Sequence, residues 1–197
     1  MIDTILGLDA RGRRQLLAEG HPIDPEALAG AAYRGTSLGM PALFDRLAWK
    51  TFQKAFHRVD GRVVGWNVRV EQRGVGAPSV PLRGRDGLPV TFGGFEVLPA
   101  AGRGVPAGCD RGLLLDYGRG GNHPLDPTSW LRDPLVAVRR EDSTLLFGWS
   151  YVSLFGLAVG TPSFFVLERE HEIRHVPRFG RPTDHAVQAE IHRTGTT

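Results

Sequence analysis

The stretch WKTFQKAFHRVDGRVVGWNVRVEQ, residues 49–72, decides the fold of this chain. On either side of its centre, apolar and polar residues come close to strict alternation, the pattern of a β-strand with one buried face. The centre is Asp60-Gly61, a dipeptide that favours the tight two-residue turn of a hairpin. Residues 49–72 therefore predict two antiparallel strands joined by a short turn.

Further strand-like runs follow this hairpin as far as Val176. Short turns separate them, and no helical segment of crossover length lies between them, so neighbouring strands should pair antiparallel. About eight such strands can bury their apolar faces in a closed barrel or in a sandwich. The adjacent Gly93 and Gly94 predict a bulge or sharp bend, which favours the barrel. We therefore predict a mainly β protein, a lipocalin-like antiparallel barrel of about eight or more strands.

Helical signals are confined to the residues before this hairpin. Residues 9–19 start with an Asp cap and end before Gly20, and residues 24–29 start with Asp-Pro and end before Gly30. A third short helix is predicted for residues 41–48. We expect the helices at 9–19 and 24–29 to form a cover near one end of the barrel.

The length of 197 residues suits one domain, and 41% hydrophobic with 23% charged residues is near the average for soluble globular proteins. We assign residues 1–176 to a single barrel domain with its helical cover. Residues 177–197 are poor in apolar side chains and are predicted to form a poorly ordered C-terminal tail.

Charge and composition argue against several classes of function. The net charge is only +3, and basic residues are interspersed with acidic ones, so no basic face for nucleic acid is expected. No signal peptide and no apolar run near the ~18 residues of a membrane span occur, which predicts a cytoplasmic protein. The single Cys109 excludes an internal disulfide. No nucleophile elbow, P-loop or dinucleotide fingerprint is present.

The segment 113–138 has two apolar runs around a polar insert, which is the pattern of a site's mouth beside apolar walls. Asp116 ends the first run and is a candidate acid or base; the alternative is an ion pair with Arg119 or Arg132. His123, within the insert, is a second candidate for moving protons, and the alternative is an exposed loop histidine.

Two stretches carry a resemblance to known proteins. LAGAAYRGTSLGMPALFDRLAWKTFQKAF, residues 28–56, resembles the GXWXG-type segment of bacterial proteins, in which a W-x-G-like strand start precedes a short helix and a W-x-K-x-F-like strand. The run Tyr33-Arg34-Gly35 stands in the place of the motif, and Lys50 in that of the lysine. The segments LLLDYG, LRDPLVAVRREDSTLLFGWSYV and TPSFFVLERE look like the companion domain of unknown function.

These proteins look like relatives of the nitrobindin and lipocalin-like barrels, so the resemblance implies a small closed barrel whose cup holds an apolar ligand. It also implies that Lys50 belongs to the signature and points into the cup, as a counter-charge or a nucleophilic amine. A solvent-facing lysine at a strand edge is the alternative. Nitrobindin relatives bind haem through a histidine near the C-terminal strands, where His171 and His175 stand here. No spacing of ligands supports a metal site, and no cofactor is expected.

The leading hypothesis is that the barrel cavity binds a small, largely apolar molecule with one polar or acidic group. The alternative is a cofactor-free isomerase, dehydratase or cyclase acting on a hydrophobic intermediate in the same cavity, with haem binding third. Catalysis would fall to Asp116, His123 and Lys50. The sequence leaves open whether two copies form a homodimer. The residues predicted to contact the ligand are Arg34, Trp66, Asn122, Asp133, Trp149, Tyr151 and Phe164.

Overall fold

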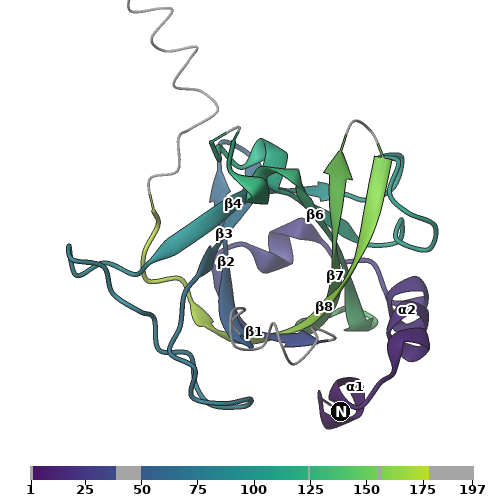
Figure 1. The fold of residues 1–197 in the computed structure, drawn as a ribbon, viewed down its shortest axis with the longest axis horizontal. Helices are drawn as coiled ribbons and strands as arrows, with labels where there is room; N and C mark the ends of the chain where they lie inside the picture. Colours follow the sequence, from purple (N-terminus) through teal and green to yellow (C-terminus); the bar gives the residue numbers. More distant parts are fainter. Residues whose placement is uncertain (1, 39–49, 124, 155–156, 178–197) are drawn as a thin grey trace, which may run out of the picture.

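The computed structural model describes residues 2–38, 50–123, 125–154 and 157–177. Among these, eight strands form a closed antiparallel barrel, in which each strand pairs with its neighbours in the chain and β8 pairs with β1 (Figure 1). The predicted lipocalin-like barrel with short N-terminal helices is therefore confirmed. The elements are α1 (Ile2–Leu6), α2 (Ala10–Glu19), η1 (Pro25–Leu28), β1 (Ala31–Leu38), β2 (Thr51–Val59), β3 (Arg62–Val68), β4 (Thr91–Pro99), β5 (Leu113–Asp116), η2 (Tyr117–Arg119), η3 (Pro127–Trp130), β6 (Leu131–Arg139), β7 (Asp142–Leu154) and β8 (Leu157–Glu172).

The hairpin at Asp60-Gly61 has the predicted form. Val59 pairs with Arg62 across the turn, so the connection contains two residues. Asp60 has φ 49° and Gly61 has φ 74°, and this left-handed pair matches the twist of the two strands it joins. The prediction for residues 49–72 is confirmed over the strands β2 and β3.

The glycine pair Gly93-Gly94 forms the predicted bulge. Gly65 of β3 lies opposite Phe95, and Asn67 lies opposite Phe92, so β4 has one residue more than β3 in this interval. A bulge of this kind bends the strand and increases its twist, which helps a sheet to close on itself.

The first strand lies earlier in the chain than alternation indicates. Alternation begins after Trp49, but the structure has β1 at Ala31–Leu38, where the resemblance placed a strand start, and β1 closes the barrel between β2 and β8. Six of its eight residues are buried. A strand that is covered on both faces does not show a polar side, and its period of two is therefore hidden.

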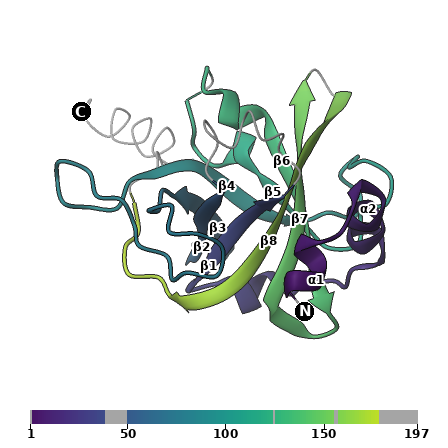
Figure 2. The same cartoon turned by 60° about the horizontal axis from the view of Figure 1, so that its bottom comes forward.

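The helical segments do not form one cover. The 3-10 helix η1 closes one end of the barrel, where Leu28 is fully buried in the interior core with Ile23. Helix α2 instead lies against the outer wall formed by β6 and β7 (Figure 2). Only η1 therefore has the expected place. Both starts are capped as predicted, because Asp9 accepts from the Gly12 N–H and Asp24 from the Glu26 N–H.

The barrel wall separates two apolar cores. The inner core contains large, fully buried side chains, among them Tyr33, Phe56, Phe95 and Leu135. The outer core lies under α1 and α2 and includes Leu17, Val136, Phe147, Phe164 and Val166. Among the described residues, no helix is both long enough and apolar enough to cross a membrane. The helix predicted at 41–48 and the tail beyond residue 177 lie outside the described residues.

Candidate functional site

Lys54 lies inside the barrel, with a side chain only 3% exposed. It stands on β2 between Phe52 and Phe56, and the alternation of the strand turns all three toward the barrel axis. The ammonium group donates to Asn67 Oδ1 at 2.9 Å, to Asp133 Oδ2 at 3.1 Å and to the hydroxyl of Tyr117. The three donors of the lysine are therefore matched by three acceptors.

The partners of Lys54 also bind one another. The Tyr117 hydroxyl donates to Asp133 Oδ2 at 2.9 Å, and Asn67 Nδ2 donates to the Gly93 carbonyl at 3.2 Å. Burial lowers the pKa of Lys54, and the charge of Asp133 opposes this shift. Burial, with the charge of Asp133, raises the pKa of Tyr117 well above its ordinary value. Asp133 Oδ1 is buried and has no hydrogen-bond partner within the described part of the chain.

Four aromatic rings surround the Lys54 ammonium at 5.1 to 5.5 Å from their centroids. At this distance each ring face attracts a cation. The rings belong to Phe52, Phe95, Tyr117 and Phe165. We call these rings, Lys54, Asp133 and Asn67 the lysine cage.

Glycines on neighbouring strands make room for the phenylalanine rings of the lysine cage. A Cβ atom at any of these glycines would lie 2.3 or 2.4 Å from a ring atom of the facing phenylalanine. The rings therefore lie across the neighbouring strands and fill the barrel at the level of Lys54. The facing pairs are Gly35 with Phe52, Gly65 with Phe95, and Gly148 with Phe165.

Sequence reasoning named Asp133 but missed Lys54. Lys50, the lysine that the resemblance selected, lies exposed in a bend just before β2. The signal that could have located Lys54 is the alternation Phe52-x-Lys54-x-Phe56, which places the lysine on the apolar face of its strand.

The two predicted acid–base candidates, Asp116 and His123, are not brought together with the lysine cage. Asp116 forms an ion pair with Arg132 at 3.1 Å, as in the alternative considered for it, whereas Arg119 binds Glu96 at 2.6 Å. His123 is exposed, and its ring nitrogen accepts from the Leu125 N–H at 3.2 Å. A catalytic role for Asp116 or His123 stays a prediction.

Asn122 fastens the polar insert to the barrel. Its Nδ2 donates to the carbonyls of Gly94 and Tyr117, both at 2.7 Å, and its Oδ1 accepts from the Gly94 N–H at 2.9 Å. The insert is therefore held at the bulge of β4, next to Tyr117 of the lysine cage. Both the oxygen and the nitrogen of the Asn122 side chain are therefore already hydrogen-bonded to backbone groups.

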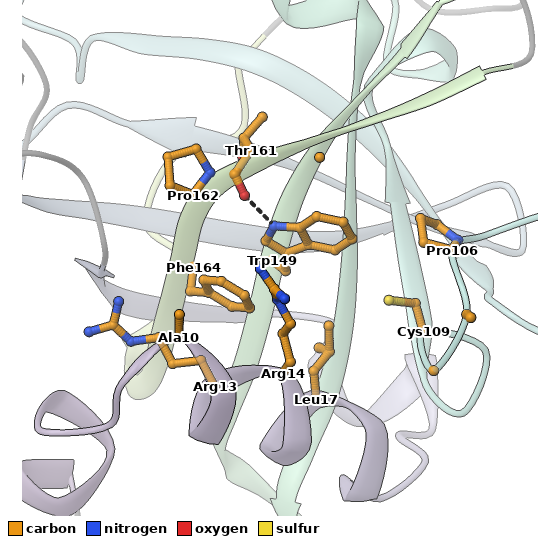
Figure 3. A pocket seen from close by; sticks show the side chains of 13 residues that line it. Ala10, Arg13, Arg14, Leu17, Pro106, Cys109, Trp149, Thr161, Pro162 and Phe164 are labelled. Atoms are coloured by element: carbon orange, nitrogen blue, oxygen red, sulfur yellow. Dashed lines mark hydrogen bonds between the residues drawn. The ribbon is translucent and has the colours of Figure 1, made fainter.

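Two of the predicted ligand contacts, Trp149 and Phe164, lie on the outside of the barrel and line a cleft there (Figure 3). The cleft has a volume of about 570 Å³ and lies between α2, residues 106–109 and the outer face of β7 and β8. The two rings stack with centroids 6.1 Å apart. Trp149 Nε1 donates to the Thr161 carbonyl at 2.7 Å, which fixes the indole as one wall. We call this hollow the α2 cleft.

Three further predicted ligand contacts, Tyr151, Trp66 and Arg34, also lie on the outer side of the barrel wall, whereas Asp133 belongs to the lysine cage and Asn122 to the polar insert. Tyr151 is 4% exposed and packs against Trp149 at 5.6 Å between ring centroids. Trp66 is 2% exposed in a small outer cluster with Ala55 and Val68. Arg34 forms an ion pair with Glu168 at 2.7 Å and donates to the carbonyls of Gly76 and Ala77.

Haem binding through His171 or His175 stays a prediction. His171 Nε2 lies 3.1 Å from Gln53 Nε2, and the described residues hold no group of three His, Cys, Asp or Glu side chains suited to a metal ion.

The chain matches no protein-family model and no curated protein. The closed barrel is consistent with a lipocalin-like fold, and its interior and its outer cleft carry the argument about function.

Proposed function

We propose that this protein binds a small, largely apolar molecule and that the α2 cleft is the binding site. The observation that carries the proposal is a hollow of about 570 Å³ with the rings of Trp149 and Phe164 as walls. Ligand sites commonly measure about 300–1,000 Å³ and are lined mainly by apolar and aromatic side chains. Leu17 of α2 adds to the apolar lining on the opposite side. Kinship with the GXWXG-type proteins stays a prediction.

The packing of the lysine cage argues for the cleft over the centre of the barrel. An eight-stranded barrel has just enough interior space for its own side chains or for one small ligand. Here four rings approach the Lys54 ammonium within 5.5 Å, and its three donors are in use. A ligand at this level would have to displace rings and break a buried ion pair, which is strongly unfavourable.

Trp149→Ala should weaken the binding of N-phenyl-1-naphthylamine, an uncharged dye that fluoresces in apolar surroundings, by about tenfold or more. Loss of the indole removes a large apolar wall from the cleft. Ala107→Trp should also weaken binding, because Ala107 is an exposed residue of the lining and a ring there would fill the cleft. Dye titrations, with circular dichroism to verify folding, measure both effects.

Trp130→Ala is the matched control, because Trp130 is 42% exposed and lies on η3 outside the cleft. It should leave the dissociation constant unchanged. No dye binding by the unchanged protein, or equal binding by all three variants, would exclude the α2 cleft as the site.

Cofactor-free catalysis is a second candidate, favoured by the contact between Lys54, Tyr117 and Asp133. These groups can exchange protons, and an isomerase, dehydratase or cyclase would need such groups beside an apolar wall. Turnover of a hydrophobic substrate that disappears in the double variant Lys54→Met/Asp133→Leu, verified to be folded by circular dichroism, but persists in Trp149→Ala would place the function in the lysine cage.

A further inference from the structure

We propose that the ligand of the α2 cleft is an anion, an apolar molecule that ends in a carboxylate or a similar acidic group, held by Arg14 with the support of Arg13. This inference rests on the proposed function and specifies the class of its ligand. It starts from the sequence of α2 and from the polar groups that face the cleft.

Helix α2 presents two arginines on the face that should be apolar. The cleft is lined by Ala10, Arg13, Arg14 and Leu17, which repeat as i, i+3, i+4 and i+7. This spacing places them on one stripe, and on a surface helix that stripe packs against the core. Arg13 is half-buried and Arg14 is exposed, and both border the cleft, whereas the exposed Arg11 lies outside it.

The positive charge of these arginines is not neutralised by the protein around them. The cleft lining contains no acidic side chain. Over residues 2–38, 50–123, 125–154 and 157–177, neither Arg13 nor Arg14 takes part in an ion pair. In the same part of the chain, the Nε of Arg13 is buried and has no hydrogen-bond partner. A buried donor without an acceptor is costly, which marks Arg13 as a cation that the described part of the protein leaves unpaired.

The polar side-chain groups of Trp149 and Thr161 in the cleft already have hydrogen-bond partners. The indole N–H of Trp149 is bound to the Thr161 carbonyl, and the Thr161 hydroxyl donates to the Ser150 carbonyl. Donors for a ligand therefore come from the guanidinium groups, whose planar fork matches a carboxylate.

The arginines lie close to the apolar walls. Figure 3 shows the Arg14 side chain extending from α2 toward Trp149 and Phe164, while the Arg13 side chain turns away from it. A ligand whose apolar body lies on the two rings would therefore have its acidic end at Arg14. A guanidinium group beside two aromatic rings favours an amphipathic anion over a free inorganic anion or a neutral hydrocarbon.

Competition between decanoate and decanol tests this inference, because the two molecules share one apolar chain and differ in charge. Each is titrated against the bound uncharged dye N-phenyl-1-naphthylamine. The unchanged protein should bind decanoate about tenfold to a hundredfold more tightly than decanol. The difference should shrink as salt is added, because Arg14 is exposed. Inorganic phosphate should not displace the dye.

Arg14→Gln should remove most of this preference, and Arg13→Gln combined with Arg14→Gln should remove it entirely, while decanol still binds. Arg11→Gln is the control, since it removes the same charge from the same helix outside the cleft and should leave the preference intact. Equal binding of decanoate and decanol, a preference that survives the double substitution, or displacement by phosphate would overturn the inference while the proposed function stands. If neither the dye nor either decyl compound binds, the proposed function itself fails.

Discussion

Asp133→Asn should lower the free energy of unfolding by about 3–5 kcal/mol, because it leaves the Lys54 ammonium buried without its counter-charge. The carboxylate and the ammonium are 3.1 Å apart, and their side chains are 2% and 3% exposed. Water therefore cannot reach the ammonium group and solvate it in place of the carboxylate. The aromatic rings around the lysine attract a cation but do not neutralise it. Urea denaturation followed by circular dichroism measures the change.

The effect of Asp133→Asn should depend on pH with a definite sign. The pKa of Lys54 is already lowered by burial, and the variant removes the charge that opposes this shift, so the pKa falls further. Between that value and the ordinary pKa of lysine, the unfolded chain binds more protons than the folded one, and stability rises with pH. The deficit relative to the unchanged protein should therefore shrink as the pH is raised from neutrality.

A double variant separates the missing charge from any damage to packing. Lys54→Met combined with Asp133→Leu replaces the ion pair by apolar side chains, and such replacements are often neutral or stabilising by about 1–4 kcal/mol. The double variant should be more stable than Asp133→Asn alone. If Asp133→Asn unfolds at the same urea concentration as the unchanged protein, Lys54 is not held as an ammonium in the barrel.

Turn chemistry and strand periodicity were enough to predict the barrel. Asp60-Gly61 specifies a two-residue hairpin by local conformation alone, and Gly93-Gly94 marks a bulge for the same reason. β1 is the instructive exception. Its outer residue Thr36 is 1% exposed, so that burial on both faces hides the alternation on which the prediction depends.

The candidate site could be predicted only in part, because periodicity divides a strand into two faces without saying which is the inner one. On β7 the bulky Phe147 and Trp149 suggest a cavity wall, yet Leu146 packs in the inner core and Gly148 stands beside Phe165. Glycine faces inward because that ring fills the space where a side chain would be. The outward aromatics are instead covered by α2.

The contact between Lys54 and Asp133 could not be predicted from the sequence for a different reason. Lys54 and Asp133 are 79 residues apart in the chain and meet through a register that depends on the whole barrel. Asp133 alone could be named from its place in a polar segment beside apolar runs. To predict Lys54 as its partner, one must know which face of β2 points toward the barrel axis.

Gly120→Ala should destabilise the protein by at least about 2 kcal/mol and release the polar insert from the barrel. A Cβ atom at this position would lie 1.8 Å from the Gly94 carbonyl oxygen, and a backbone atom cannot move aside as a flexible side chain can. The insert would have to shift, and the three hydrogen bonds by which Asn122 holds Gly94 and Tyr117 would break. Hydrogen exchange at the Gly94 amide, which donates to Asn122, should accelerate together with the loss of stability.

Gly7→Ala is the matched control, because its Cβ would come no closer than 3.6 Å to a neighbouring atom, and it should change stability by less than about 0.5 kcal/mol. Equal stability of the two variants, with unchanged exchange at Gly94, would show that residues 117–122 form a loose surface loop and do not brace the barrel beside Tyr117 of the lysine cage.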